Sequence, residues 1–268
     1  MTHSGRTYTT LDYDVREAVA WITFKRPERF NALDSAMARE LCDVANRCSS
    51  DHGVRAAVMT GSGEQAFCAG GDVSVFAARL DDIEVLVKEM TTYLHAAVSR
   101  FARMRAPLIT AVNGVAAGAG FSLVTCCDLA IAAESATFTS AYTRIGLTPD
   151  GSSTHFLSRL VGTRRAMELY LTNRVLTAAE ALDWGLVNRV VPADSLATEA
   201  GALARQLAEG PTGAYGGVKA LLQSAAGESL ETQMELESRA IAAAGASPDG
   251  QEGIRAFIDK RPARFTGA

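Results

Sequence analysis

Two glycine-rich turns in this sequence could place backbone amides around one oxygen. The first spans residues 67–72 (FCAGGD) and the second spans residues 113–120 (NGVAAGAG). Glycine allows the main chain to approach a ligand where a side chain would clash. If a helix begins near Gly118, its first N–H groups lack helical partners and attract negative charge. Two such donors on one oxygen form an oxyanion hole for enolate or tetrahedral chemistry, worth about 3–4 kcal/mol per donor.

The second turn does not match the phosphate-binding motifs that also use glycine. A dinucleotide motif needs a third glycine, and Gly118 and Gly120 are followed instead by Leu123. A P-loop needs a lysine, and none lies between Lys88 and Lys219. A turn that only lets a strand pack closely on a helix remains open from this stretch alone.

The composition indicates a globular protein with a large core and a small-molecule partner. The chain has 268 residues, 48% of them hydrophobic, and a mean hydropathy of +0.07. Its net charge of −4 disfavours nucleic acid and anionic membranes as partners. No apolar run suggests a membrane span or a signal peptide. The five cysteines indicate reduced thiols and a cytoplasmic location, and the four scattered histidines disfavour a metal site.

The elements that must position the turns alternate between strands and helices. Strands are predicted at residues 15–24, 54–60, 108–112 and 129–133, and helices at 34–48 (with Asp34 as N-cap) and 83–103. This alternation predicts a mainly parallel sheet. Both glycine turns would then follow strands of one sheet, where α/β proteins bind ligands.

The pattern changes after residue 152. Helices are predicted over residues 152–184, 193–245 and 248–260, and one strand over 187–191. We therefore divide the chain into an α/β core, residues 1–190, and a helical C-terminal region, residues 191–268.

Five stretches together resemble the enoyl-CoA hydratase/isomerase (crotonase) superfamily. The two glycine turns resemble its oxyanion-hole motifs, and residues 26–33 (RPERFNAL) resemble its CoA-binding turn. Residues 182–187 (LDWGLV) and 257–261 (FIDKR) resemble its C-terminal signatures. The resemblance implies a crotonase-like spiral of repeated ββα turns, with a helical C-terminal region that forms a homotrimer or a dimer of trimers. It also implies acyl-CoA substrates, with coenzyme A carried by the substrate and no other cofactor.

The resemblance assigns roles to single residues. The backbone N–H groups of Gly71 and Ala119 would bind the thioester oxygen, and alanine at 119 is no obstacle because the donor is main chain. Substrate or CoA contacts are implied for Arg29, Phe30, Ala32, Ala69, Asp72, His95, Ser122, Tyr142, Phe257 and Lys260. Among these, Phe257 and Lys260 often serve a neighbouring subunit in the family, Tyr142 would form an aromatic wall, and Asp72 would cap the helix behind the first turn.

Departures from the family pattern bear on the reaction. Family hydratases use two glutamates, and the matching positions here hold Ser122 and Tyr142, which do not exchange protons readily near neutral pH. Asp150 occupies the position of a catalytic aspartate in the dienoyl-CoA isomerases, ring-opening isomerases and aryl-CoA dehalogenases of the family. From local sequence alone, the Pro-Asp-Gly at 149–151 would equally suit a helix N-cap.

We predict an acyl-CoA isomerase in which Asp150 moves a proton between two carbons while Gly71 and Ala119 hold the enolate oxygen. One carboxylate suffices, because the group that removes the proton returns it. The second turn and the C-terminal segments look most like the ring epoxide/oxepin-CoA isomerases of phenylacetate degradation. Three alternatives stay open: an enoyl-CoA hydratase that uses Asp150 and water, a dehalogenase-type hydrolase with Asp150 as nucleophile and His95 as base, and a non-catalytic binding or scaffold protein.

Overall fold

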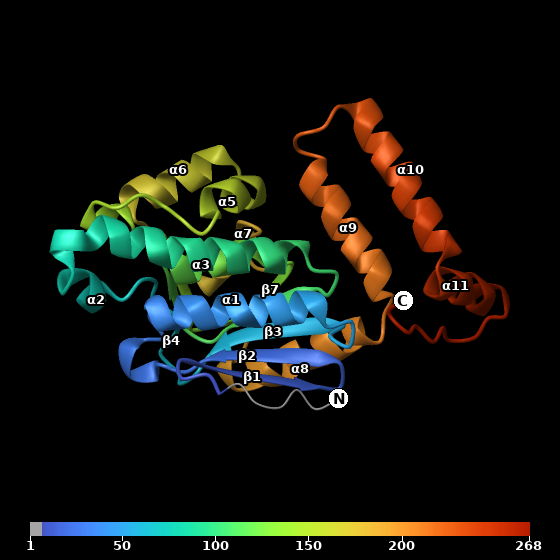
Figure 1. The fold of residues 1–268 in the computed structure, drawn as a ribbon, viewed down its shortest axis with the longest axis horizontal. Helices are drawn as coiled ribbons and strands as arrows, with labels where there is room; N and C mark the ends of the chain where they lie inside the picture. The colour runs from blue at the N-terminus through green and yellow to red at the C-terminus, as the bar shows by residue number, and fades with distance from the viewer. Residues whose placement is uncertain (1–6) are drawn as a thin grey trace.

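The computed structural model describes residues 7–268, and its largest element is a six-stranded sheet in the order β1-β2-β3-β5-β7-β10 (Figure 1). The strands are β1 Leu11–Arg16, β2 Val19–Phe24, β3 Ala56–Gly61, β5 Leu108–Val112, β7 Leu129–Ala133 and β10 Arg189–Val191. Strands β2 to β10 pair in parallel, and β1 pairs antiparallel with β2. The mainly parallel sheet that the sequence predicts is therefore confirmed.

The first strand prediction was wrong in one respect. Residues 15–24 do not form one strand, because the chain reverses at Glu17 and Ala18 between β1 and β2. Both residues have positive φ, 52° and 60°. Tight hairpins of this kind favour glycine or asparagine at such positions, so the sequence gives no turn signal there.

A second, four-stranded sheet carries both glycine turns. Its order is β4-β6-β8-β9, with β4 Ala66–Cys68, β6 Val115–Ala117, β8 Thr137–Thr139 and β9 Leu176–Thr177. Gly70 and Gly71 of the first turn follow β4, and Gly118 and Gly120 of the second follow β6, the parallel neighbour of β4. The turns thus follow strands of one sheet, as predicted. The predicted strands at 54–60 and 108–112, however, lie in the larger sheet as β3 and β5, and the short strands β4 and β6 lead into the turns instead.

Eleven α-helices surround these sheets within residues 7–268. They are α1 Ser35–Ser50, α2 Val73–Ala77, α3 Ile83–Arg103, α4 Ala119–Cys126, α5 Ser153–Val161, α6 Thr163–Thr172, α7 Ala178–Asp183, α8 Leu196–Ala208, α9 Thr212–Ser224, α10 Leu230–Ala246 and α11 Pro248–Ile258, with short 3-10 turns at Pro27–Arg29, Leu80–Asp82, Thr143–Ile145 and Ala193–Ser195. Asp34 caps α1 by accepting a hydrogen bond from the Met37 amide (2.8 Å), as predicted. In the described part of the chain, no helix has both the length and the apolar character needed to cross a membrane.

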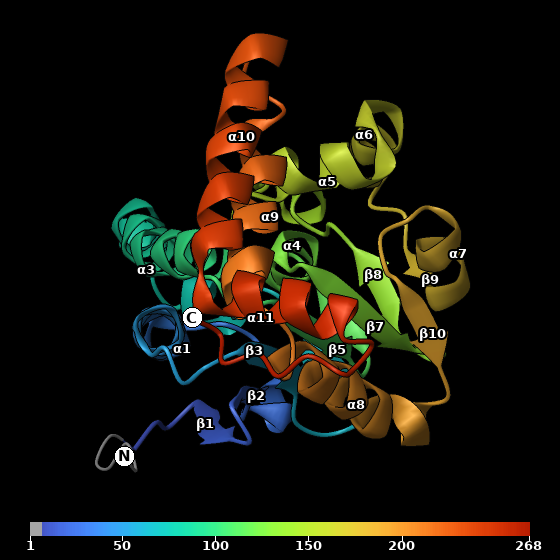
Figure 2. The same cartoon turned by 90° about the vertical axis from the view of Figure 1, so that its right-hand side faces the viewer.

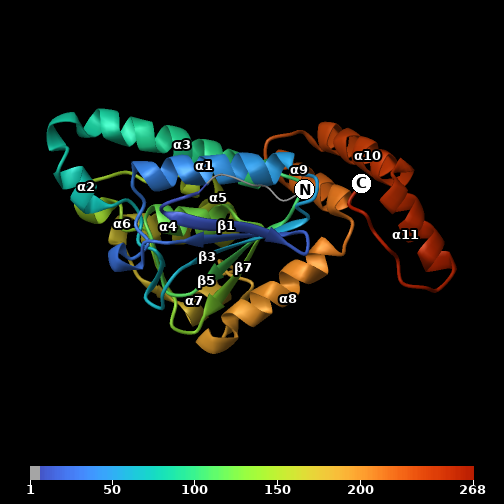
Figure 3. The same ribbon diagram turned by 60° about the horizontal axis from the view of Figure 1, so that its bottom comes forward.

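Two apolar cores lie on opposite faces of the large sheet. Helices α1, α3 and α4 cover one face, and α8 covers the other (Figure 2). Helix α8 belongs by number to residues 191–268, yet its Leu196, Ala200 and Ala204 pack against the sheet. Of the helices in residues 191–268, α9, α10 and α11 extend away from the sheet (Figures 1 and 3).

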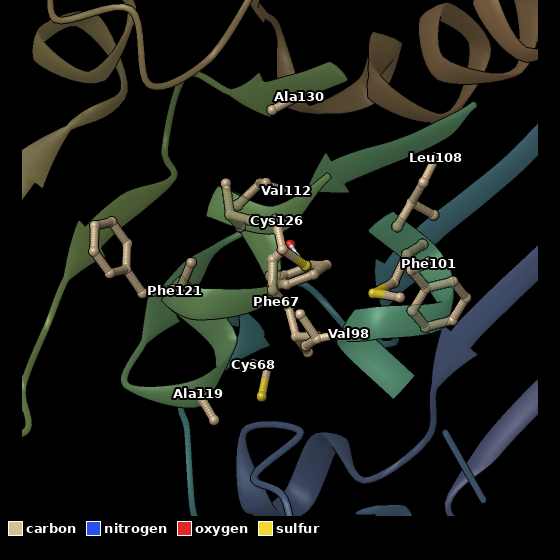
Figure 4. Close-up of a cluster of buried hydrophobic side chains, with 14 of the residues drawn as sticks. Phe67, Cys68, Val98, Phe101, Leu108, Val112, Ala119, Phe121, Cys126 and Ala130 are labelled. Atoms are coloured by element: carbon tan, nitrogen blue, oxygen red, sulfur yellow. Dashed lines mark hydrogen bonds between the residues drawn. The ribbon is translucent and has the colours of Figure 1, made fainter. Parts of the chain in front are cut away.

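The core also fixes the start of α4. Figure 4 shows Cys68, at the end of β4, beside Ala119 at the beginning of α4. A Cβ added to Gly120 would lie 2.0 Å from the Cys68 carbonyl oxygen, so only glycine permits this approach. The close packing brings the end of β4 and the first turn of α4 together.

Candidate active site

The two glycine turns meet in space. A Cβ added to Gly70 would lie 2.9 Å from the Ala117 carbonyl oxygen and 3.3 Å from the Ala119 amide nitrogen. Gly70 also has φ of +97°, which L side chains rarely adopt. Close approach and backbone conformation therefore both require glycine at this junction.

The two amides expected to bind an oxygen are both unpaired at this junction. Leu33 donates to the Gly70 carbonyl (2.7 Å) and accepts from Asp72 (2.8 Å), and this parallel pairing leaves the Gly71 N–H pointing away from Leu33. Ala119 is the first residue of α4, where an N–H has no partner within the helix. Neither N–H donates a hydrogen bond to any residue of the range 7–268.

The predicted CoA-binding turn lies beside the first glycine turn. The Ala69 amide donates to the Phe30 carbonyl (3.0 Å), and Phe30 and Asn31 both have positive φ. The buried Asn31 side chain holds this shape by donating to the Ala66 carbonyl (2.8 Å). Phe30 is 50% exposed and Ala32 is buried, while Arg29 ends the 3-10 turn before them. The structure thus brings Arg29, Phe30, Ala32 and Ala69 to one edge of the junction.

Asp72 is a structural anchor of the first turn. It caps α2 by accepting from the Ser74 amide (3.1 Å) and hydroxyl (2.5 Å), which confirms the predicted cap. It also pairs with the Arg26 guanidinium (2.9 Å), a partner that the sequence analysis missed. Burial alone would raise the pKa of Asp72, but the hydrogen bonds from Ser74 and Arg26 outweigh it and lower the pKa.

The Asp150 carboxylate is tied to the helix that begins at Ala119. Its Oδ1 accepts a hydrogen bond from the Tyr142 hydroxyl (2.6 Å). The Tyr142 hydroxyl lies 2.8 Å from the Ser122 hydroxyl, and Ser122 is one turn into α4. The Ser122 hydroxyl is also 2.9 Å from the Asp150 carbonyl oxygen. Three residues far apart in the sequence therefore form one hydrogen-bonded cluster near the two free amides.

The local chain around Asp150 is a tight turn rather than a helix cap. Gly151 and Ser152 both have φ of +61°, and the Ser153 amide donates back to the Asp150 carbonyl (3.2 Å). Helix α5 has Ser152, without a side-chain bond, at its N-cap position. The alternative that Asp150 caps this helix is therefore wrong, and its side chain is directed to Tyr142 instead.

His95 approaches the same turn from α3. Its Nε2 accepts a hydrogen bond from the Gly151 amide (3.1 Å) and lies 3.9 Å from Asp150 Oδ2. Because a backbone N–H can only donate, Nε2 carries a lone pair and the neutral ring carries its proton on Nδ1. In this arrangement His95 supports the turn and its Nε2 is already occupied.

The buried cysteines are held as thiols. Burial raises the pKa of Cys68, directly before the first turn, to about 11, and that of Cys127 to about 12. Thiolate chemistry next to the junction is therefore disfavoured at neutral pH. Among the residues that the structure describes, no three or more His, Cys, Asp or Glu side chains are grouped to hold a metal ion.

Phe257 and Lys260 lie away from this cluster. Phe257 is 88% exposed near the end of α11, and Lys260 follows that helix with φ of 53°. Helix α11 lies at the opposite end of the molecule from α2 and β4 (Figures 1 and 3). Within one chain the structure does not bring these two residues to the other predicted site residues.

Comparison with known proteins supplies the family. Residues 14–268 match the family model described as enoyl-CoA hydratase/isomerase. The chain belongs to this family. The enoyl-CoA hydratase/isomerase family, also called the crotonase superfamily, has the mixed α/β spiral and helical C-terminal region seen here, and the chain is an enzyme of that family acting on acyl-CoA.

Family members that resemble this chain differ in the reactions they are named for. A probable enoyl-CoA hydratase of Rhodobacter capsulatus is 40% identical over 97% of this chain and 99% of its own length. The 1,2-epoxyphenylacetyl-CoA isomerase of Escherichia coli is 38% identical over 94% and 97%, and 4-chlorobenzoyl coenzyme A dehalogenase-2 of an Arthrobacter species is 38% identical over 91% and 88%. The solved enoyl-CoA hydratase of Bacillus anthracis superposes with a TM-score of 0.90 at 31% identity, over 97% of this chain and 100% of its own. Similarity therefore gives the family and leaves the reaction open.

Proposed function

We propose that this enzyme isomerises acyl-CoA thioesters by moving a double bond or opening a ring epoxide, with Asp150 as general base. The observation that carries the proposal is the hydrogen bonding of the Asp150 carboxylate, which leaves one of its two oxygens without a donor among the described residues. Its Oδ1 is held by the neutral Tyr142 hydroxyl (2.6 Å), and no residue of the range 7–268 donates a hydrogen bond to its Oδ2. A carboxylate that keeps one oxygen free can accept a proton from carbon.

The reaction begins when Asp150 Oδ2 takes a proton from a carbon activated by the thioester carbonyl. The C–H bond breaks, its electron pair moves toward the carbonyl oxygen, and an O–H bond forms at Oδ2. The N–H groups of Gly71 and Ala119 stabilise the oxygen as it gains charge, each contributing about 3–4 kcal/mol. The positive end of α4 adds to this stabilisation.

The second half of the reaction returns the proton. The dienolate delocalises its charge to a more distant carbon, and the Asp150 carboxylic acid protonates that carbon. The enzyme therefore ends in its starting state with no net change in atoms. The 38% identity to 1,2-epoxyphenylacetyl-CoA isomerase supports an isomerisation of this kind.

A hydratase is the second candidate, favoured by the 40% identity to a probable enoyl-CoA hydratase. Hydration by two carboxylates needs acids at the positions of Ser122 and Tyr142, and these two hydroxyls bond to each other and to Asp150. A hydratase of this chain would have to rely on Asp150 and water alone. For this reason we rank isomerisation first.

The dehalogenase-type hydrolysis gains less support. It would require His95 to activate water, and the His95 Nε2 lone pair accepts the Gly151 amide. Asp150 would also need a free path to an aromatic ring carbon as nucleophile.

We further propose that CoA lies along the turn formed by Arg29, Phe30 and Ala32, and that a neighbouring copy supplies Phe257 and Lys260. Helix α10 contains no buried residue, and the three C-terminal helices expose large apolar side chains. These are Val218, Leu222, Leu230, Met234, Ile241, Ile254, Phe257 and Ile258. A homotrimer or dimer of trimers would cover them, and light scattering on the purified protein measures that state.

A thioester screen tests the proposed reaction. Purified enzyme is incubated with 2-enoyl-, 3-enoyl-, dienoyl- and 4-halobenzoyl-CoA, and the products are separated and weighed by mass spectrometry. We expect a product of unchanged mass from 3-enoyl- or dienoyl-CoA. Faster addition of one water to 2-enoyl-CoA would indicate a hydratase, and release of halide would indicate the hydrolase.

A further inference from the structure

We propose that Tyr142 and Ser122 are positioning residues that hold Oδ1 of Asp150, so that Oδ2 alone exchanges the substrate proton. The inference rests on the proposed role of Asp150 as base. It differs from the expected role of Tyr142 and Ser122 in substrate contact, because the Tyr142 hydroxyl bonds the carboxylate and the Ser122 hydroxyl faces Tyr142 and the Asp150 carbonyl.

The direction of the bond to the carboxylate follows from counting protons. An ionised carboxylate only accepts, so the Tyr142 hydroxyl must give its one proton to Asp150 Oδ1, 2.6 Å away. The Ser122 hydroxyl has one proton and several acceptors within reach, among them the Tyr142 oxygen at 2.8 Å and the Asp150 main-chain carbonyl at 2.9 Å. Tyr142 therefore holds the carboxylate, and Ser122 contacts both the Tyr142 hydroxyl and the backbone of Asp150.

Both hydroxyls are fixed before substrate binds. Ser122 is fully buried in the first turns of α4, and a Cβ added to Gly151 would lie 2.8 Å from the Ser122 Cβ. Burial and the adjacent Asp150 charge raise the pKa of Tyr142 well above its usual value, so the phenol keeps its proton during turnover. Rotation of the carboxylate would break the bond from Tyr142, which favours a single orientation.

The other oxygen is left for chemistry. Asp150 Oδ2 lies 3.9 Å from His95 Nε2, beyond hydrogen-bond distance, and Nε2 already accepts the Gly151 amide. In the described chain, the titratable groups that face the Asp150 turn are His95 on α3, Tyr142, and Tyr170 on α6, which contacts the turn through Ser153. During turnover the C–H bond breaks and an O–H bond forms at Oδ2, while Tyr142 and Ser122 keep their protons. The same oxygen then returns the proton.

The test is Tyr142→Phe, assayed on the thioester that the wild-type enzyme isomerises. We expect kcat to fall about 10- to 100-fold, the effect of losing one hydrogen bond to a charged group, with KM changed less than about threefold. Without the Tyr142 hydroxyl, the ionised Asp150 carboxylate loses a hydrogen bond and takes up a proton more readily. The acidic limb of the pH profile of kcat should therefore move to higher pH. Ser122→Ala should also lower kcat and move the acidic limb to higher pH, each by a smaller amount.

Tyr13→Phe is the matched control. Tyr13 is a half-buried residue of β1, in the large sheet, and its hydroxyl faces the Cys48 thiol at 3.8 Å rather than the Asp150 turn. Its removal should leave kcat and the pH profile unchanged. If Tyr142→Phe does not fold, Ser122→Ala decides the question by the shift of its acidic limb.

The outcomes separate this inference from the proposed function. A wild-type kcat and an unmoved acidic limb in folded Tyr142→Phe, beside an inactive Asp150→Asn, would overturn only the positioning roles. Full isomerase activity in Asp150→Asn would overturn the proposed function itself. A slow Tyr142→Phe with a displaced acidic limb supports both.

Discussion

Two aspartates of this enzyme have similar exposure but different partners. The side chain of Asp128 is 23% exposed and that of Asp150 is 27% exposed. Asp128 Oδ2 lies 2.6 Å from the Lys219 ammonium and also accepts the Leu108 amide (2.7 Å). Asp150 Oδ1 instead accepts from one neutral phenol, and no lysine or arginine of the described residues pairs with its carboxylate.

The difference separates an anchoring carboxylate from the one that we propose as the general base. Lys219 also donates to the carbonyl groups of Phe101 (3.1 Å) and Ala106 (3.2 Å), so it ties α9 to α3 and to the chain before β5. A proton taken up by Asp128 would leave the buried Lys219 ammonium without its counter-charge. A carboxylate held by a neutral hydroxyl can take up a proton without leaving a buried cation unpaired. We therefore expect changes near Asp128 to cost stability and changes near Asp150 to cost turnover.

Apart from changes to Asp150 itself, the largest loss of turnover is expected from Ala119→Pro. Proline lacks an N–H and is tolerated at the first position of a helix, which Ala119 occupies in α4. Loss of this donor should lower kcat about 100- to 1,000-fold with little change in melting temperature. Ala119→Gly keeps the N–H and should stay near wild type, so an equal loss in both variants would argue against the amide.

Lys219→Met tests the Asp128 side of the comparison and should lower the stability of the protein. It leaves the Asp128 carboxylate without its cation, and breaking a buried pair typically costs about 3–5 kcal/mol of unfolding free energy. Urea unfolding measures this loss, and kcat per folded molecule should not change. Lys88→Met, at the exposed pair with Glu84, is the control and should have little effect. A stable Lys219→Met with reduced kcat would reverse the assignment of roles.

The instability of Lys219→Met should depend on pH. Burial raises the pKa of Asp128 above its usual value, although Lys219 opposes that shift. A raised carboxyl pKa gives stability that is present at low pH and lost as pH rises through the folded-state value. Removing Lys219 enlarges this effect, so the deficit against wild type should be smaller at about pH 5 than at about pH 7.5. A deficit that grows toward acid would contradict this reasoning.

The smallest effect concerns His95. Glutamine offers an oxygen that can accept the Gly151 amide, and leucine offers none. We expect His95→Gln to stay within about threefold of wild-type kcat and His95→Leu to lose about tenfold. Equal losses in both variants would instead indicate that His95 exchanges protons.

Much of the fold could be predicted because its long elements have clear periodicity. Helix α3 and strands β5 and β7 begin and end at the predicted residues. The hairpin at Glu17 and Ala18 could not be predicted, because neither residue signals positive φ. Strands β8 and β9 are too short to show any alternation.

The arrangement of the candidate site residues could be predicted only in part, for a different physical reason. The family resemblance gave Gly71, Ala119 and Asp150 as candidates, and the glycines beside Gly71 and Ala119 indicated that two turns could approach each other closely. The bonds that join Ser122, Tyr142 and Asp150 depend on how α4 packs against a loop, and spacing along the chain does not reveal that packing. The same holds for the pair of Arg26 with Asp72.

The most direct test of the account is the turnover of Asp150→Asn. Asparagine preserves the size of the side chain and can still accept from Tyr142, but it cannot take a proton from carbon. We predict a folded protein whose kcat for isomerisation is lower by about 100- to 10,000-fold. A kcat within a few-fold of wild type would contradict the assignment of Asp150 as the base.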